Sequence, residues 1–220
     1  MIAVILDMDG LVLDTEPISL RAWQRASAEY GWQCSESIYC GMVGLGREEC
    51  REYLRRHIHA EGVIEAITKT ANAYYLAEID RDGIRCKRGL FRLLDFLEAT
   101  EIPTAVATST ETTVALRQLD QTGIASRFNV VVGGDCISKG KPSPDIFLLA
   151  AARLGRVSGQ CVVLEDAAPG IKAAVAAGMT AILVPDLCVP DGEIQRLAFT
   201  IVASLDEAIP VIQHLNTRIP

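Results

Sequence analysis

Apolar and polar positions along this chain follow two patterns, which predict two kinds of structure. Residues 2–6 form an apolar run with no polar position, which is typical of a strand buried on both faces of a parallel sheet. Beyond residue 100, short apolar runs alternate with stretches of helical periodicity, the pattern of βαβ units. We therefore predict strands at residues 2–6, 104–107, 130–132, 161–164, 181–184 and 200–202, and helices at 90–99, 112–122, 144–154 and 170–177.

A different pattern separates the first strand from the others. Apolar residues recur at helical spacing on charged surfaces in three stretches, residues 17–30, 47–60 and 64–79. Gly62 is expected to separate the last two of these helices. Because a single strand cannot fold alone, the first strand must pair with the later ones. The predicted fold class is α/β, with a parallel-sheet core domain formed by residues 1–14 and 84–220 and an all-helical domain inserted at 15–83.

Composition narrows the functional classes. The chain has 220 residues, half of them hydrophobic, and a formal net charge of -7, which disfavours nucleic acid and anionic membrane surfaces as partners. No basic region precedes the short N-terminal apolar run, so we expect no signal peptide or membrane span, and a cytoplasmic monomer. Seven cysteines are scattered without a CxxC pair, and we expect them to be reduced packing residues: Cys34, Cys40, Cys50, Cys86, Cys136, Cys161 and Cys188.

Two carboxylates follow the first predicted strand. Asp7 and Asp9 are spaced to point the same way on an extended chain, and Gly10 allows a sharp turn. Two acids so close repel each other unless a cation or a shared proton intervenes. A solvated loop with an Asx-turn remains an alternative for this short motif. The segment predicts a functional site if the ends of the other strands supply partners.

Polar groups do follow the other strands. Thr108 and Ser109 precede a predicted helix, whose N-terminus can bind an anion or simply be capped. Lys141 lies on a stiff loop between Gly140 and Pro142, with Lys139 as a competing cation. Glu165 and Asp166 end the next strand. Since carboxyl ends of parallel strands meet at one edge of the sheet, these groups predict a Mg²⁺-dependent phosphoryl-transfer site.

The motifs in this order resemble those of the haloacid dehalogenase-like hydrolases, over nearly the whole chain. The matching residues are Asp7-x-Asp9-Gly10, Thr108-Ser109, Lys141-Pro142-x-Pro144-Asp145, and Glu165-Asp166 with Gly170. More narrowly, residues 7–16 and 170–179 are similar to the branch that contains sugar-phosphate phosphatases and β-phosphoglucomutase. The resemblance implies a Rossmann-like core with a helical cap, and a Mg²⁺-dependent phosphatase for a small phosphorylated metabolite.

The resemblance also implies roles for individual residues. Asp7 would be the nucleophile that forms an aspartyl-phosphate, and Asp9 the general acid and base. Thr108, Ser109 and the Gly10 turn would bind phosphate oxygens, and Lys141 would offset the phosphoryl charge. Mg²⁺ would be bound by the Asp7 carboxylate, the Asp9 backbone carbonyl and Asp166, while Glu165 would join the metal set or orient a metal-bound water.

Substrate choice would lie in the helical cap. Arg47 resembles a cap arginine that faces the active site in sugar-phosphate relatives and could bind a second anionic group; a solvated surface charge is the alternative. A sugar-phosphate mutase remains a rival function, although Ser19 stands where β-phosphoglucomutase is expected to have a histidine. A receiver-like signalling module is disfavoured by the size of the insertion and the position of Asp7 on the first strand.

Overall fold

The computed structural model describes residues 2–218 and contains a six-stranded sheet in which every neighbouring pair is parallel. The strand order is β3-β2-β1-β4-β5-β6, so the first strand of the chain lies inside the sheet. This confirms the predicted α/β fold class. The strands are β1 (Ala3–Leu6), β2 (Thr104–Ala107), β3 (Val130–Val132), β4 (Cys161–Glu165), β5 (Thr180–Leu183) and β6 (Thr200–Ile201).

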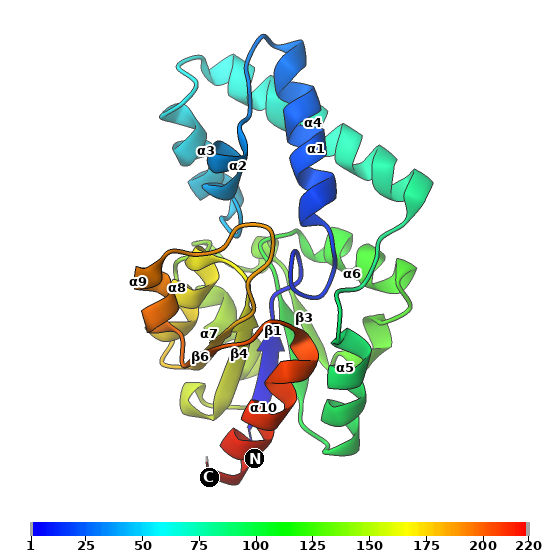
Figure 1. Cartoon of the computed structure of the whole chain (residues 1–220), viewed down its shortest axis with the longest axis vertical. Helices are drawn as coiled ribbons and strands as arrows, with labels where there is room; N and C mark the ends of the chain where they lie inside the picture. The colour runs from blue at the N-terminus through cyan, green and yellow to red at the C-terminus, as the bar shows by residue number, and fades with distance from the viewer. Residues whose placement is uncertain (1, 219–220) are drawn as a thin grey trace.

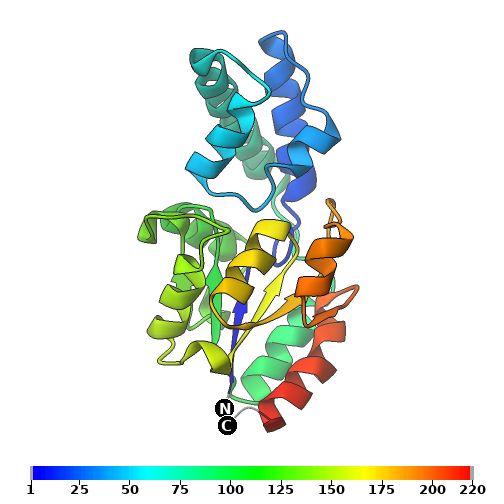
Figure 2. The ribbon, with the colours of Figure 1, turned by 90° about the vertical axis from the view of Figure 1, so that its left-hand side faces the viewer.

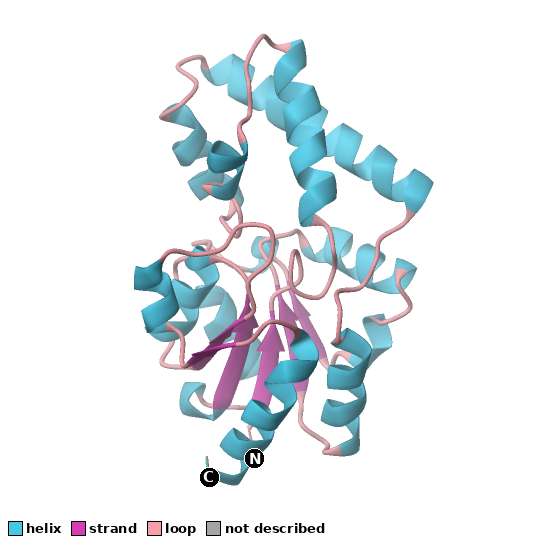
Figure 3. Cartoon of the chain, viewed as in Figure 1, coloured by secondary structure: helices cyan, strands magenta, loops and turns pink. Residues whose placement is uncertain are grey.

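Helices cover both faces of the sheet, as Figure 3 shows. Val4 and Leu6 of β1 pack into one apolar layer, and Ala3 and Ile5 into the other. This alternation explains why the strand has no polar position, because both of its faces are buried. The core helices are α5 (Leu90–Ala99), α6 (Thr112–Gln121), α7 (Asp145–Arg153), α8 (Ala168–Ala176), α9 (Gly192–Leu197) and α10 (Ala208–Arg218).

After β1, the first four helices of the described chain lie above the upper ends of the strands, before α5 and β2 return to the core (Figures 1 and 2). We call residues 15–83 the helical insertion; it packs around its own apolar cluster. Its longest helix is α4, but no helix among residues 2–218 is long and apolar enough to cross a membrane. The helices are α1 (Glu16–Glu29), α2 (Glu36–Cys40), α3 (Arg47–Arg55) and α4 (Glu61–Asp82).

The two connections to the helical insertion run side by side. Asp14 N donates to Arg85 O at 2.8 Å, and Lys87 N donates to Val12 O at 3.0 Å. Chain entry and exit therefore share one narrow stalk, as expected of an inserted unit. The predicted division into two domains at residues 14/15 and 83/84 stays a prediction.

Two predictions about the insertion were wrong. Gly62 does not end a helix, since it lies in the first turn of α4. There a glycine is tolerated because the first N–H groups of a helix have no intrahelical partner in any case. Cys40 and Cys188 are not reduced, because they form a disulfide that joins α2 to the loop after β5. These residues are 148 positions apart, and only the folded chain brings them together. Cys34, Cys50, Cys86, Cys136 and Cys161 are free thiols, as expected.

Candidate active site

The carboxyl ends of β1, β2 and β4 meet below the helical insertion (Figure 1). Leu6 is in register with Val106 on one side and Leu164 on the other, so the residues that follow these strands lie side by side. Asp7 N continues the ladder by donating to Leu164 O at 3.1 Å. The sheet register therefore places Asp7 beside the acids that end β4.

Three of the predicted residues form a buried acid cluster. Each of Asp7, Glu165 and Asp166 offers a carboxylate oxygen, and these oxygens lie within 4.8 Å of one another. All three side chains are buried. Asp166 Oδ1 has no hydrogen-bond partner among the described residues, which is costly for a buried carboxylate oxygen. Hard oxygen donors with one unpaired oxygen fit a divalent cation such as Mg²⁺.

Lys141 supplies the positive charge of this site. Its side chain is only 1% exposed, and Nζ donates to Asp7 Oδ1 and, at 2.7 Å, to Glu165 Oε1. Burial alone would lower the pKa of Lys141, but the carboxylates of Asp7 and Glu165 raise it above its ordinary value. Lys141 is therefore a fixed cation. Lys139, the alternative cation considered from the sequence, makes none of these contacts.

The acids carry more negative charge than Lys141 can balance. Burial, together with the charges of Glu165 and Asp9, raises the pKa of Asp7 to about 8 even though Lys141 acts in the opposite direction. Burial and the neighbouring carboxylates, Glu165 first among them, raise the pKa of Asp166 well above its usual range. A bound cation would return both groups to their charged forms. The electrostatics and the unpaired oxygen thus point to the same missing positive charge.

Asp9 lies in a different environment from Asp7. Its Oδ1 accepts from Thr15 Oγ1 at 2.8 Å, and its Oδ2 accepts from Thr108 Oγ1 at 3.3 Å and from Thr110 Oγ1 at 2.8 Å. Its carboxylate is thus held by three hydroxyls and is not part of the acid cluster. Our site prediction omitted Thr110, although the run of three hydroxyls after β2 was a signal that could have found it.

Two glycines are required by the acids themselves. Gly10 has a φ of +80°, and a Cβ placed on it would lie 2.4 Å from Asp166 Oδ2. A Cβ on Gly170, in the first turns of α8, would lie 1.6 Å from Glu165 Oε1. The first glycine permits the turn after Asp9, and both permit backbone to pass close to a carboxylate. The glycines of the two motifs are therefore part of the site's shape.

Ser109 and Arg47 lie where the helical insertion touches the core. Ser109 Oγ donates to Gly44 O at 3.3 Å, so this hydroxyl binds the insertion in the present arrangement. Arg47 forms a 3.0 Å ion pair with Glu111, and its side chain is 78% exposed. The structure therefore brings Asp7, Asp9, Gly10, Thr108, Lys141, Glu165 and Asp166 together and leaves Arg47 at the rim.

A buried carboxylate next to the site was missed as a functional candidate. Glu16, the first residue of α1, is 7% exposed and accepts a hydrogen bond from Tyr39 of α2. Burial raises its pKa to about 7. A Cβ on Gly10 would come within 3.1 Å of its side chain, so Glu16 borders the same turn as Asp166. Nothing in its spacing along the chain indicated burial.

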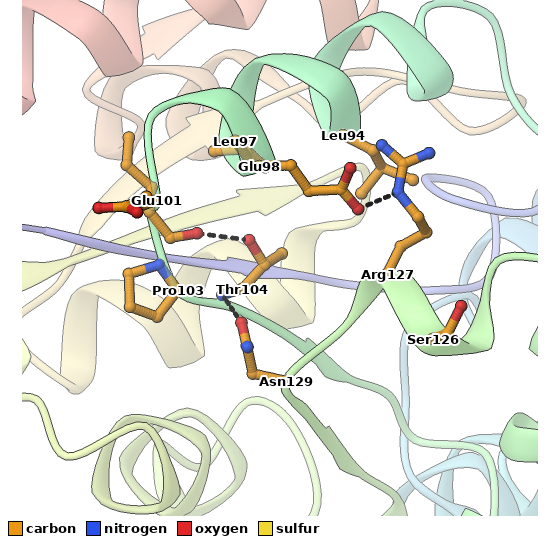
Figure 4. A pocket seen from close by; sticks show the side chains of 10 residues that line it. Leu94, Leu97, Glu98, Glu101, Pro103, Thr104, Ser126, Arg127 and Asn129 are labelled. Carbon is orange, nitrogen blue, oxygen red and sulfur yellow. Dashed lines mark hydrogen bonds and ion pairs between the residues drawn. The ribbon is translucent and has the colours of Figure 1, made fainter.

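A pocket of about 380 Å³ opens at the opposite end of the sheet, between α5 and the starts of β2 and β3 (Figure 4). Its polar groups are paired with one another: Thr104 N donates to Asn129 Oδ1 at 2.8 Å, and Arg127 donates to Glu98 and Asp95. Ligands of α/β sheets bind at the carboxyl ends of the strands, not at this end. We assign no catalytic role to this pocket.

Comparison with known proteins agrees with the geometry. The chain is 32% identical, over 80% of its length and 82% of the relative's, to a phosphorylated carbohydrates phosphatase of Thermotoga maritima. It is 34% identical, over 81% of its length and 94% of the relative's, to a fructose-1-phosphate phosphatase of Escherichia coli. The crystal structure of CbbY from Rhodobacter sphaeroides with phosphate is 28% identical and superimposes with a TM-score of 0.80, covering 94% of this chain and 96% of that one.

The family profile described as haloacid dehalogenase-like hydrolase matches residues 4–184, a span that includes every motif residue of the acid cluster. Its phosphatase relatives confirm the predicted class of enzyme. The chain therefore belongs to the haloacid dehalogenase-like hydrolases.

Proposed function

We propose that this enzyme is a Mg²⁺-dependent phosphatase that hydrolyses a small phosphate monoester, a sugar phosphate or a similar metabolite, through an aspartyl-phosphate on Asp7. The observation that carries this proposal is the acid cluster at the ends of β1 and β4, with Lys141 donating to Asp7 and with Asp9 held separately by hydroxyls. One carboxylate beside a cation and a second carboxylate beside hydroxyls are the two groups that such a reaction requires.

The metal would be held by the carboxylates of Asp7 and Asp166 and by the backbone carbonyl of Asp9. The unpaired Oδ1 of Asp166 supports this assignment. Glu165 would orient Lys141 or a metal-bound water and would not bind the metal directly, since its oxygens already accept from Lys141 Nζ and, at 2.8 Å, from Ala167 N. Bound Mg²⁺ would screen the repulsion between the Asp7 carboxylate and the phosphate oxygens.

The residues would divide the reaction into two displacements. An Asp7 carboxylate oxygen attacks phosphorus, the ester P–O bond breaks, and Asp9 gives its proton to the leaving alkoxide. Asp9 then takes a proton from water as the water attacks phosphorus, the bond between phosphorus and Asp7 breaks, and phosphate leaves. Lys141 holds Asp7 in position, while Thr108 and the Ser109 amide bind phosphate oxygens.

The substrate class rests on the relatives and on the helical insertion. Two of the relatives are named as phosphatases of phosphorylated carbohydrates and of fructose 1-phosphate, and Arg47 at the rim could meet a second anionic group of a substrate. The insertion would act as a cap that selects the ester and limits the access of bulk water. In a mutase the aspartyl-phosphate would react with a sugar hydroxyl instead of water, and Ser19 in place of a histidine disfavours that outcome.

The proposal is tested by phosphate release from a panel of phosphorylated sugars, polyols and nucleotides, with and without Mg²⁺. Hydrolysis should require the metal and should be lost in Asp7→Asn, because the amide cannot form the acyl phosphate. Asp95→Asn, which changes an exposed acid at the other end of the sheet, is the matched control and should keep full activity. Turnover by purified Asp7→Asn would exclude the covalent route. Isomerisation of a sugar phosphate without phosphate release would instead identify a mutase.

A further inference from the structure

A covalent bond joins the helical insertion to the core. Cys40 is the last residue of α2, and Cys188 lies on the loop between β5 and α9; their Cα atoms are 5.4 Å apart. In Figure 1 this loop, drawn in orange, rises from the sheet toward α2. The disulfide is thus at the seam between the insertion and the core.

The seam lies directly over the acid cluster. Cys40 and Cys188 line a cavity of about 220 Å³ together with Ala167 and Pro169. Ala167 follows the metal-site residue Asp166, and it belongs to the apolar cluster of the insertion. The backbone of Gly44 passes so close to it that a Cβ on Gly44 would lie 2.8 Å from the Ala167 side chain. Moving residues 40–44 away from the core would therefore uncover the site.

The other polar contacts that residues 40–49 of the insertion make with the core are weak individually. Ser109 donates to Gly44 O at 3.3 Å, and Gly140 N donates to Glu49 at 3.2 Å. The Arg47–Glu111 ion pair is exposed on both sides, and exposed pairs contribute little to stability. Such contacts can break and re-form during each cycle of substrate entry and product release. The disulfide cannot, because an S–S bond does not exchange without an attacking thiolate.

The disulfide is accessible to reagents in solution. Cys40 and Cys188 are both partly exposed, and the neighbours Leu187 and Val189 are 44% and 67% exposed. By contrast, the free thiols of Cys34 and Cys161 are buried, and burial raises the pKa of each to about 11. A small thiolate can therefore reach this sulfur pair far more readily than those two thiols.

We propose that Cys40 and Cys188 form a reversible redox tether that holds the helical insertion closed over the active site. A dithiol reductant attacks one sulfur, the S–S bond breaks, and a second attack frees both thiols while the reductant becomes a disulfide. A small-molecule disulfide reverses the exchange, taking two electrons and leaving as two thiols. The oxidised enzyme would turn over slowly, because substrate and phosphate must pass the closed seam; the reduced enzyme would be the active form. The regulatory part of this proposal rests on the proposed function.

Activity measurements with matched cysteine variants test the tether. Wild-type protein is oxidised with glutathione disulfide or reduced with dithiothreitol, its free thiols are counted, and kcat is measured on the best ester of the panel. Reduction should expose two further thiols and raise kcat several-fold. Cys40→Ser and Cys188→Ser should both show the high rate and no response, whereas Cys50→Ser should respond like wild type. Equal kcat in both redox states, or a response that persists in Cys40→Ser, would overturn the proposal.

Hydrogen exchange separates failure of the tether from failure of the proposed function. Amides of residues 36–45 should exchange faster in the reduced than in the oxidised wild type, and equally fast in both states of Cys188→Ser. This readout needs no turnover, so it holds even if no ester of the panel is hydrolysed. Identical exchange in the two redox states of the wild type, with the thiol count showing that the disulfide had formed, would contradict the tether by itself.

Discussion

The edge of the core and the interior of the helical insertion bury opposite kinds of side chain. At the core edge Asp7, Lys141, Glu165 and Asp166 are all buried, and their charges are only partly balanced. The insertion packs around apolar side chains and keeps its ion pairs, such as Arg55 with Glu61, on the surface. Buried charge destabilises a fold unless it is paired, whereas apolar burial stabilises it. The core edge is therefore shaped by chemistry and the insertion interior by packing.

After loss of the nucleophile in Asp7→Asn, Asp9→Asn should reduce the rate most. Its carboxylate would exchange protons in both displacements, and general acid–base help of this kind contributes about 10²–10⁴-fold to rate. The amide oxygen can keep the two contacts of Oδ2 with Thr108 and Thr110, so the fold should be retained. Steady-state kinetics and a thermal melt check this. Glu61→Gln, in the insertion, is the control and should leave kcat unchanged. An equal loss of kcat in both variants would contradict the contrast between a catalytic core edge and an insertion held by packing.

Gly10→Ala should disturb metal and nucleophile together. The new Cβ would meet Asp166 Oδ2 at 2.4 Å, and misplacement of a catalytic group by about 1 Å can reduce rate by about 10²-fold. Gly83→Ala is a matched control, because its φ is +75° but no atom lies within 4 Å of its Cβ position. Both variants carry the backbone strain, so only Gly10→Ala should raise the Mg²⁺ concentration needed for half-maximal activity. Similar Mg²⁺ responses would contradict the assignment.

The raised pKa of Asp7 predicts how stability depends on pH without metal. The folded carboxyl titrates near 8 and the unfolded one near 3.8, so the folded state binds more protons between these values. Stability should therefore fall as pH rises from about 4 to about 8. Melting temperatures across this range measure the slope. Mg²⁺ should restore stability most at the alkaline end, and Asp7→Asn should flatten the slope. If the metal-free protein became more stable as pH rises from about 4 to about 8, the inferred excess of negative charge around Asp7 would be wrong.

Arg47→Ala should have the smallest effect. Its exposed pair with Glu111 contributes little to stability, so the melting temperature should barely change. If Arg47 meets a second anionic group, KM should rise several-fold for bisphosphates and stay constant for monophosphates, with kcat unchanged. Arg55→Ala, on the same helix but paired with Glu52 and Glu61, is the control. Equal KM values for both ester classes would return Arg47 to an ordinary surface charge.

Most of the sheet and much of the site could be predicted from the sequence, because both depend on local patterns. The bounds of β2, β3 and α5 agree with the predicted residues, since each is an unbroken apolar or amphipathic segment with clear ends. The short helices α2 and α9 were not predicted, because five or six residues hold too little periodicity. The helix α10 was also missed, although its apolar positions pack against the core.

The missed site residues have a common cause. Neither Thr110 nor Glu16 is one of a pair of acids or lies next to a glycine that marks a motif. Their position in the site therefore depends only on how the chain folds. Thr110 reaches Asp9 because β1 and β2 are neighbours in the sheet, and Glu16 is buried because α2 covers it through Tyr39. Their contacts are made between segments far apart in the sequence.

By itself the sequence determined the α/β class and the order in which acids, hydroxyls and a lysine follow successive strands. Local periodicity and strand direction are enough for that, because the carboxyl ends of parallel strands always share an edge. Only the tertiary structure decided that Lys141 is buried against Asp7, that Asp166 keeps an unpaired oxygen, and that Cys40 meets Cys188. These depend on distances between remote segments, which are set by how the segments pack in three dimensions and by no pattern along the chain.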